Sequence, residues 1–205
     1  MTTLVTFGSS PVMGKTSFPS IIAQRLGYDH VDCGRPATSN SKITRKILSY
    51  KNYTDSVVVA AWSSTVRHEF RTEHGWKGID IAWYKKGSGL FEDHWFNGPG
   101  NWEYTGVSTA LKEISIAQTF LLSNQIPYLF VFDMNEIIDS FLFKNPDDYL
   151  GSMINMIDWN RFVLFDNNGF KNWARKNNFE FKDATHPADS THKLAADYIL
   201  ERFKF

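Results

Sequence analysis

Three residues whose side chains can together activate a hydroxyl group stand near the two ends of the chain. Ser10 follows a short apolar run at residues 4–7 and lies in the segment Gly-Ser-Ser. Asp183 and His186 are three positions apart in a segment that ends with Pro187. A serine nucleophile needs a base that takes its proton, and that base needs a carboxylate that fixes its tautomer. These residues can therefore supply a nucleophile, a base and an orienting acid.

The N-terminal segment also allows a nucleotide-binding interpretation. Gly14, Lys15 and Thr16 end a loop that stands between an apolar run and a helical pattern. In a phosphate loop, backbone amides hold the phosphates and the lysine neutralises them. Gly8 and Gly14 enclose residues 9–13, one residue more than that motif has. The Asp-His pair near the C-terminus favours hydrolysis, and the phosphate loop stays the alternative.

Apolar runs and helical patterns alternate along the chain and must position these residues. The run SVVVAA at residues 56–61 is typical of a strand buried on both faces. The alternation predicts an α/β fold whose mainly parallel sheet is covered by helices on both faces. Such folds place their sites at the carboxyl ends of the strands. Strands are expected at 4–7, 30–33, 56–61 and 126–132, and helices at 17–26, 43–48, 108–124, 170–177 and from Pro187 onward.

Residues 70–107 differ from the rest because they are rich in Trp, Gly, Lys and His and show no clear periodicity. We expect them to form an irregular insertion at the mouth of a pocket. His68, His74 and His94 lie in or beside this segment. Zinc sites have tighter ligand spacing, so no metal site is expected here.

The composition is that of a single domain spanning residues 1–205. Twenty-two basic residues balance 22 acidic ones, which argues against nucleic acid as a partner. The single cysteine, Cys33, excludes an internal disulfide and fits a reducing compartment. The chain shows no signal peptide and no apolar run that could span a membrane, so a cytoplasmic location is expected.

Four sequence segments match the style of one known family. GSSPVMG at 8–14 is similar to its block GCSFTxG, and ATSN at 37–40 is similar to its block GASN. VVVAAWSSTVRHEF at 57–70 is similar to its third block, and DATHP at 183–187 is similar to its last. On these segments the chain resembles the SGNH/GDSL hydrolase superfamily, in particular its small phage-encoded branch. The resemblance covers most of the chain and implies a three-layer α/β/α sandwich with a flavodoxin-like sheet.

The resemblance also implies roles for individual residues. Ser10, Asp183 and His186 would form the catalytic triad. The backbone amides of Ser10 and Ala37 would stabilise the oxyanion. Ser64, or its neighbour Ser63, takes the place of the family's asparagine, which is the third donor.

Four further residues are expected close to the site. Ser63 and Asn40 would line it, and Asn40 could replace the missing amide donor. Ser9 stands beside the nucleophile. Arg67 either lines the site or forms an ion pair with Glu69 that supports it.

The sequence thus predicts a serine hydrolase that cleaves an O-acyl ester on a carbohydrate or another small polar substrate. This chemistry needs no metal and no organic cofactor. Two alternatives stay open: a nucleotide-binding enzyme that uses Gly14, Lys15 and Thr16, and a non-catalytic binding protein on the same scaffold.

Overall fold

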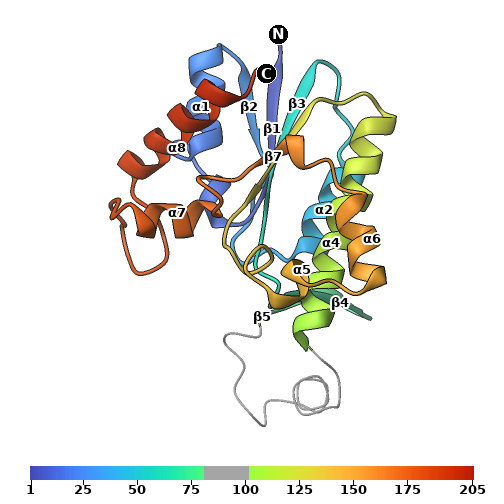
Figure 1. The fold of residues 1–205 in the computed structure, drawn as a ribbon. Helices are drawn as coiled ribbons and strands as arrows, with labels where there is room; N and C mark the ends of the chain where they lie inside the picture. Colours follow the sequence, from blue (N-terminus) through green and yellow to red (C-terminus); the bar gives the residue numbers. More distant parts are fainter. Residues whose placement is uncertain (81–101) are drawn as a thin grey trace.

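A sheet of five parallel strands forms the centre of the computed structural model, which describes residues 1–80 and 102–205 (Figure 1). The strands are β1 (Thr3–Gly8), β2 (Asp29–Asp32), β3 (Ser56–Trp62), β6 (Tyr128–Phe132) and β7 (Phe162–Val163). Their order in the sheet is β2-β1-β3-β6-β7, and every neighbouring pair is parallel. This is the flavodoxin-like order that the sequence predicted.

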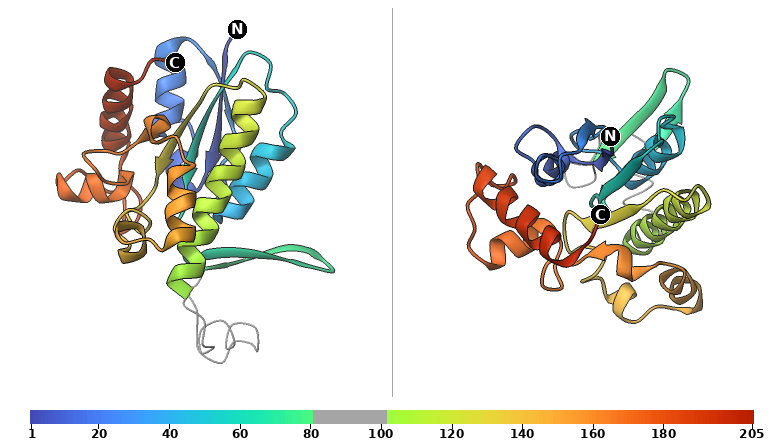
Figure 2. Two further views of the ribbon diagram at one scale, coloured as in Figure 1. Left: turned by 45° about the vertical axis from the view of Figure 1, so that its right-hand side comes forward. Right: turned by 90° about the horizontal axis from the view of Figure 1, so that it is seen from above.

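Helices cover both faces of the sheet, which confirms the three-layer α/β/α arrangement (Figures 1 and 2). None of the helices in the described residues is long and apolar enough to cross a membrane. One face carries α1 (Phe18–Leu26), α7 (Phe170–Lys176) and α8 (Asp189–Arg202), and the other carries α2 (Asn40–Ser49), α4 (Trp102–Ser123) and α6 (Asp148–Asn155). The shorter helical segments are η1 (Ser10–Val12), α5 (Phe141–Lys144) and η3 (Trp159–Arg161).

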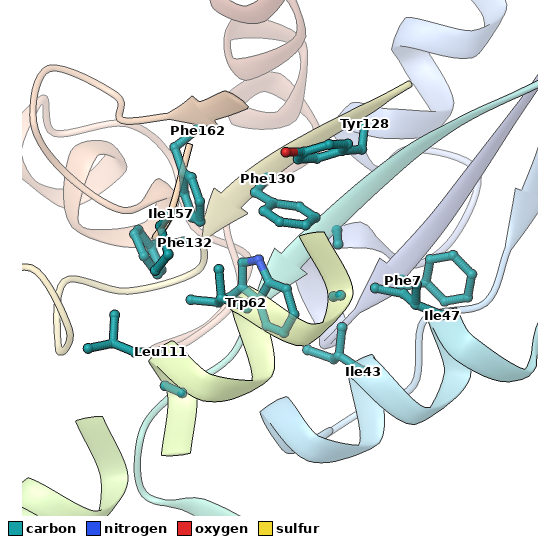
Figure 3. Packing of buried hydrophobic residues seen from close by; sticks show 14 of the residues in the cluster. Phe7, Ile43, Ile47, Trp62, Leu111, Tyr128, Phe130, Phe132, Ile157 and Phe162 are labelled. Carbon is teal, nitrogen blue, oxygen red and sulfur yellow. The ribbon is translucent and has the colours of Figure 1, made fainter. Parts of the chain in front are cut away.

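Strand β3 is the middle of the sheet, and every one of its residues is buried. Successive side chains of a strand point to opposite faces. Val58, Ala60 and Trp62 therefore enter the core under α2 and α4, whereas Val59 and Ala61 enter the core under α1 and α8. Figure 3 shows the rings packed around Trp62 in the core under α2 and α4. The continuous apolar run in the sequence reflects this burial on both faces.

The predicted insertion at 70–107 is partly wrong. Strands β4 (Arg67–Thr72) and β5 (Gly75–Asp80) form an antiparallel hairpin that extends from the main body (Figure 2). Helix α4 begins at Trp102, six positions earlier than residue 108. Among the described residues the hairpin strands pair only with each other, so they lack the apolar alternation of a half-buried sheet. The centre of the predicted insertion, residues 81–101, lies outside the described residues.

Two further elements differ from the sequence-based expectation. Strand β7 has only two residues, which is too short to give a periodic signal among the mixed pattern around it. The last helix, α8, begins at Asp189 and not at Pro187. Pro187 is instead held in a β-bridge with Phe181. This bridge closes the loop that precedes α8.

His192 of α8 is buried where α8 meets α1 and α7. Its ring stacks on Phe18, and its Nδ1 accepts a hydrogen bond from the Phe18 N–H at 3.3 Å. The ring of Phe170 lies 5.1 Å away, centroid to centroid. Burial first, and then the charge of Lys182, lowers the pKa of His192 to about 4. The folded protein therefore contains this histidine in its neutral form.

We expect this neutral histidine to make the protein acid-sensitive. The unfolded chain takes up a proton near pH 6.5, while the folded chain does so only near pH 4. The stability contribution is thus present above pH 6.5 and is lost as the pH falls towards 4, by about 3 kcal/mol at most. His192→Asn retains an acceptor for the Phe18 N–H but does not titrate. Urea unfolding between pH 7 and 4 should show a smaller acid loss for this variant.

The matched control is His74→Asn, because the side chain of His74 is 81% exposed. This control should lose as much stability on acidification as the wild type. An equal acid loss in His192→Asn and in the wild type would contradict the assignment to His192.

Candidate active site

A pocket of about 430 Å³ lies beside the carboxyl ends of the central strands. Ser10 follows β1, Ser64 follows β3 and Glu136 follows β6, and all three line this pocket. The loop before α8 adds Thr185 and His186. Open parallel sheets bind their ligands at this edge. A larger hollow of about 740 Å³ lies at the amino ends of the strands, but it contains no residue of the predicted triad.

Gly8 determines how β1 delivers Ser10 to the pocket. Its φ is +148°, and an added Cβ would lie only 2.7 Å from the carbonyl oxygen of Ala61 in β3. Only glycine fits this close approach of the two strands. The chain then turns into η1, which begins at Ser10 and contains Pro11. Ser10 is half-buried and lines the pocket, whereas Ser9 is fully buried.

Asp183 and His186 form a hydrogen-bonded pair. His186 Nδ1 lies 2.8 Å from Asp183 Oδ2. Asp183 Oδ1 also accepts hydrogen bonds from the N–H of Thr185 at 2.7 Å and from its hydroxyl at 2.9 Å. The hydrogen bonds from Thr185, together with that from His186, hold the pKa of Asp183 well below its usual range. The carboxylate stays charged and fixes the ring, so that Nε2 is the nitrogen available to act as a base.

Backbone hydrogen bonds hold the loop that carries this pair. The Lys182 N–H donates to the His186 carbonyl at 2.8 Å, and the Ala188 N–H donates to the Glu180 carbonyl at 2.9 Å. The loop is therefore fixed at both of its ends. Asp183 and His186 are three positions apart in this loop, and this local spacing is sufficient to bring their side chains into contact.

The structure brings Ser10, Ala37 and His186 into one pocket wall, although they are far apart in the sequence. None of the hydrogen bonds of the described residues joins the Ser10 hydroxyl to the His186 ring. Such contacts are often long in ligand-free enzymes and tighten when substrate binds. Ser10 and His186 therefore line the same pocket, as a nucleophile and its base would.

Ser64 lies in the pocket, but its hydroxyl group is engaged. It donates to Glu136 Oε2, and the Thr65 N–H donates to the same oxygen at 2.8 Å. The Val66 N–H in turn donates to the Ser64 hydroxyl oxygen at 3.2 Å. A hydroxyl has only one proton to give. In this structure the proton of Ser64 therefore goes to Glu136 and not to the pocket.

The remaining sequence-predicted residues have varied positions. Asn40 is buried, and both ends of its amide bind the Ser63 main chain, at 2.7 Å and 3.2 Å. It therefore joins α2 to the end of β3, and it is not one of the described residues that line the pocket. The Ser63 hydroxyl accepts from Arg67 Nη1 at 2.9 Å, and Arg67 lines the pocket. Glu69 forms its ion pair with Arg45, at 3.0 Å.

The phosphate-loop alternative does not fit the geometry. The Gly14 N–H donates to Asp32 Oδ2 at 2.9 Å, so a carboxylate lies where the alternative needs a phosphate. Helix α1 begins only at Phe18, whose N–H is bound by His192. Lys15 is exposed to solvent. The described residues also contain no group of three His, Cys, Asp or Glu side chains that could hold a metal ion.

Sequence reasoning missed a buried ion pair under the pocket. Asp133, at the end of β6, is 1% exposed, and its Oδ2 lies 3.1 Å from Lys171 Nζ on α7. The Ser9 hydroxyl donates to the same oxygen at 3.1 Å. Lys171 and Arg175 both line the pocket from α7. Two signals in the sequence were available. Lys171 and Arg175 are four residues apart on a predicted helix, and Asp133 directly follows the apolar run at 126–132.

We expect the Asp133–Lys171 pair to be important for stability. Lys171→Met leaves a buried carboxylate without its cation and should lower the free energy of unfolding by about 3–5 kcal/mol. Adding Asp133→Asn should recover part of this loss, because it removes the unpaired charge. Urea unfolding at pH 7 measures both effects.

The control Lys176→Met changes an exposed lysine of the same helix and should alter the free energy of unfolding by no more than about 0.5 kcal/mol. A loss below 1 kcal/mol for Lys171→Met would contradict the expected role.

Comparison with known proteins gives results only at the level of structure. No protein-family model matches the sequence, and no curated protein matches it. The acetyl xylan esterase AlAXEase aligns over 97% of this chain and 98% of its own, with 16% identity and a TM-score of 0.52. The esterase EstA from Pseudoalteromonas sp. aligns over 98% and 96%, with 10% identity and a TM-score of 0.53.

A third similar structure is a protein from Parabacteroides merdae ATCC 43184 that is described as a GDSL-like lipase. It aligns over 98% of this chain and 94% of its own, with 11% identity and a TM-score of 0.54. These alignments extend over nearly the whole chain. The chain therefore has the fold of the GDSL-type hydrolases, the superfamily that its sequence segments resemble.

Proposed function

We propose that this protein is a serine esterase that hydrolyses an O-acyl ester of a carbohydrate or another small polar molecule. The Ser10 hydroxyl oxygen attacks the acyl carbon while His186 takes its proton. The tetrahedral intermediate collapses, and His186 returns the proton to the departing alcohol. Water then attacks the acyl-enzyme with the help of His186 and releases the carboxylic acid and free Ser10. Asp183 holds the ring of His186 throughout.

One observation supports this proposal above all others. Ser10 and His186 line one pocket, and His186 already carries an ionised Asp183 on its Nδ1 at 2.8 Å. A surface histidine beside an aspartate would explain the pair, but it would not explain why a serine at the end of β1 shares the pocket with it. The pocket also lies at the edge of the sheet where such folds carry their chemistry.

We assign the oxyanion hole to the backbone amides of Ser10 and Ala37. Ala37 lines the pocket and has a φ of +48°, a left-handed conformation that is unfavourable for an alanine. A strained backbone conformation beside a pocket is a common mark of a functional site. Ser64 then acts through its hydrogen bond to Glu136, and it reaches the oxyanion only if that bond breaks.

The carbohydrate part of the proposal draws on the solved structures. AlAXEase is described as an acetyl xylan esterase. Eight of the twelve described residues that line the pocket have polar side chains, which can hydrogen-bond to a hydrophilic substrate. A short acyl group on a sugar hydroxyl is therefore the substrate that we propose.

The nucleophile can be tested by comparing the two adjacent serines. Ser10→Ala should abolish labelling by a fluorophosphonate and lower the hydrolysis of acetyl esters by about 10⁴-fold or more, because the acyl acceptor is lost. Ser9→Ala should remain labelled, since the Ser9 hydroxyl faces the buried Asp133. Mass spectrometry of the labelled peptide and initial rates measure both.

A wild-type protein that takes up no label would contradict the esterase proposal and favour a non-catalytic binding protein. Labelling of Ser10→Ala at the wild-type rate would place the nucleophile elsewhere. Unfolding curves of both variants verify that each one is folded.

The role of Ser64 can be tested in the same assays. A lost oxyanion donor typically lowers turnover by about 10²–10³-fold. Because the Ser64 proton goes to Glu136, we expect Ser64→Ala to lower kcat by less than about tenfold. A 100-fold loss in a folded variant would show that Ser64 donates to the oxyanion directly.

A further inference from the structure

The pocket wall carries more positive than negative charge. Arg67 from β4 and Lys171 and Arg175 from α7 line it, and Glu136 is the acidic residue among its lining residues. The chain as a whole has 22 basic and 22 acidic residues. The local excess of cations is therefore produced by the fold and does not follow from the composition.

Arg175 lines the pocket, and no carboxylate of the described residues neutralises its charge. Lys171 is neutralised by Asp133, at 3.1 Å. Arg175 has neutral partners, because its Nη2 donates to the Ala184 carbonyl at 3.1 Å and its guanidinium lies 5.4 Å from the centre of the Phe181 ring. No carboxylate of the described residues lies within ion-pair distance of Arg175. Its charge is thus available to a ligand.

The position of Arg175 also places this charge next to the reaction centre. Ala184, which accepts its hydrogen bond, stands between Asp183 and Thr185 in the loop that carries His186. The contact with Phe181 limits the motion of the same guanidinium. A guanidinium presents paired N–H donors that match the oxygens of a carboxylate, sulfate or phosphate group. An anion bound by Arg175 would therefore lie in the same pocket as the ester.

We propose that the substrate is an acylated carbohydrate that carries an anionic group on the sugar, and that Arg175 binds this group. This inference rests on the proposed esterase function and specifies its substrate class. Arg67 from β4 also lines this pocket. The shared chemistry is a planar or tetrahedral oxyanion on the sugar, either a carboxylate or a sulfate.

The test compares two esters that differ only in charge. The kcat/KM for a methyl O-acetylglucuronoside should exceed that for the matching methyl O-acetylglucoside by at least about tenfold, and this ratio should fall with added salt. Arg175→Gln should bring the two values within about twofold, because kcat/KM falls more for the charged ester than for the neutral one. Arg175→Lys should retain part of the preference. Lys176→Gln, an exposed lysine one position further on, should retain all of it.

A sulfated O-acetylglucoside in the same series distinguishes the two anions, since the arm with the higher kcat/KM identifies the group that Arg175 binds. A second readout does not depend on turnover. Glucuronate should slow the fluorophosphonate labelling of Ser10 more than glucose does, and this difference should vanish in Arg175→Gln.

The outcomes separate the two proposals. Labelling of Ser10 with equal rates for charged and neutral esters, and equal protection by glucuronate and glucose, would overturn the substrate proposal and leave the esterase function standing. An absence of labelling in the wild type would overturn both. Loss of activity on both esters in Arg175→Gln would show a structural role for Arg175 and would also overturn its role in charge recognition.

Discussion

A single buried carboxylate holds together the elements that form the pocket. Asp133 directly follows β6, and its N–H donates to the Trp62 carbonyl of β3 at 2.9 Å. Its side chain accepts from the Ser9 hydroxyl and from Lys171 Nζ, and its carbonyl accepts the N–H of Lys171. A buried charge is tolerated only when its partners are fixed in place. The carboxylate therefore fixes the end of β1 and the start of α7 relative to each other, and the backbone N–H of Asp133 joins them to the end of β3.

This constraint explains the neighbouring roles of two adjacent serines. Ser9 is directed inward to the carboxylate, which anchors the loop after β1. Ser10, the next residue, is thereby presented to the pocket. Glu136 similarly anchors the loop after β3, because its carboxylate accepts hydrogen bonds from the Ser64 hydroxyl and the Thr65 N–H. Polar contacts at the ends of β1, β3 and β6 thus shape a site that the apolar core alone would leave undefined.

The charged residues of this protein are unevenly distributed, although their formal charges sum to zero. The chain has 22 basic and 22 acidic residues, yet the pocket gathers cations from the hairpin and from α7. Only α7 contributes two of them at helical spacing, while the third arrives from a distant strand. Lys171 forms an ion pair with the buried Asp133, so it stabilises the fold. Arg175 donates to a neutral carbonyl group, so its charge is available to bind a ligand.

The sequence by itself determined the elements whose signal is local. The apolar run of β3 followed from burial on both faces, Gly27 with its φ of +69° ended α1, and the spacing of Asp183 and His186 was enough to predict their pairing. Tertiary structure decided everything that depends on contacts between distant segments. It gave the Ser64 proton to Glu136, used Asn40 to join two elements, and formed β7, which is too short to show a period. It also placed Ser10 and His186 in one pocket. Local patterns record which face of an element is buried, whereas the partner of a polar side chain depends on chain segments that meet only after folding.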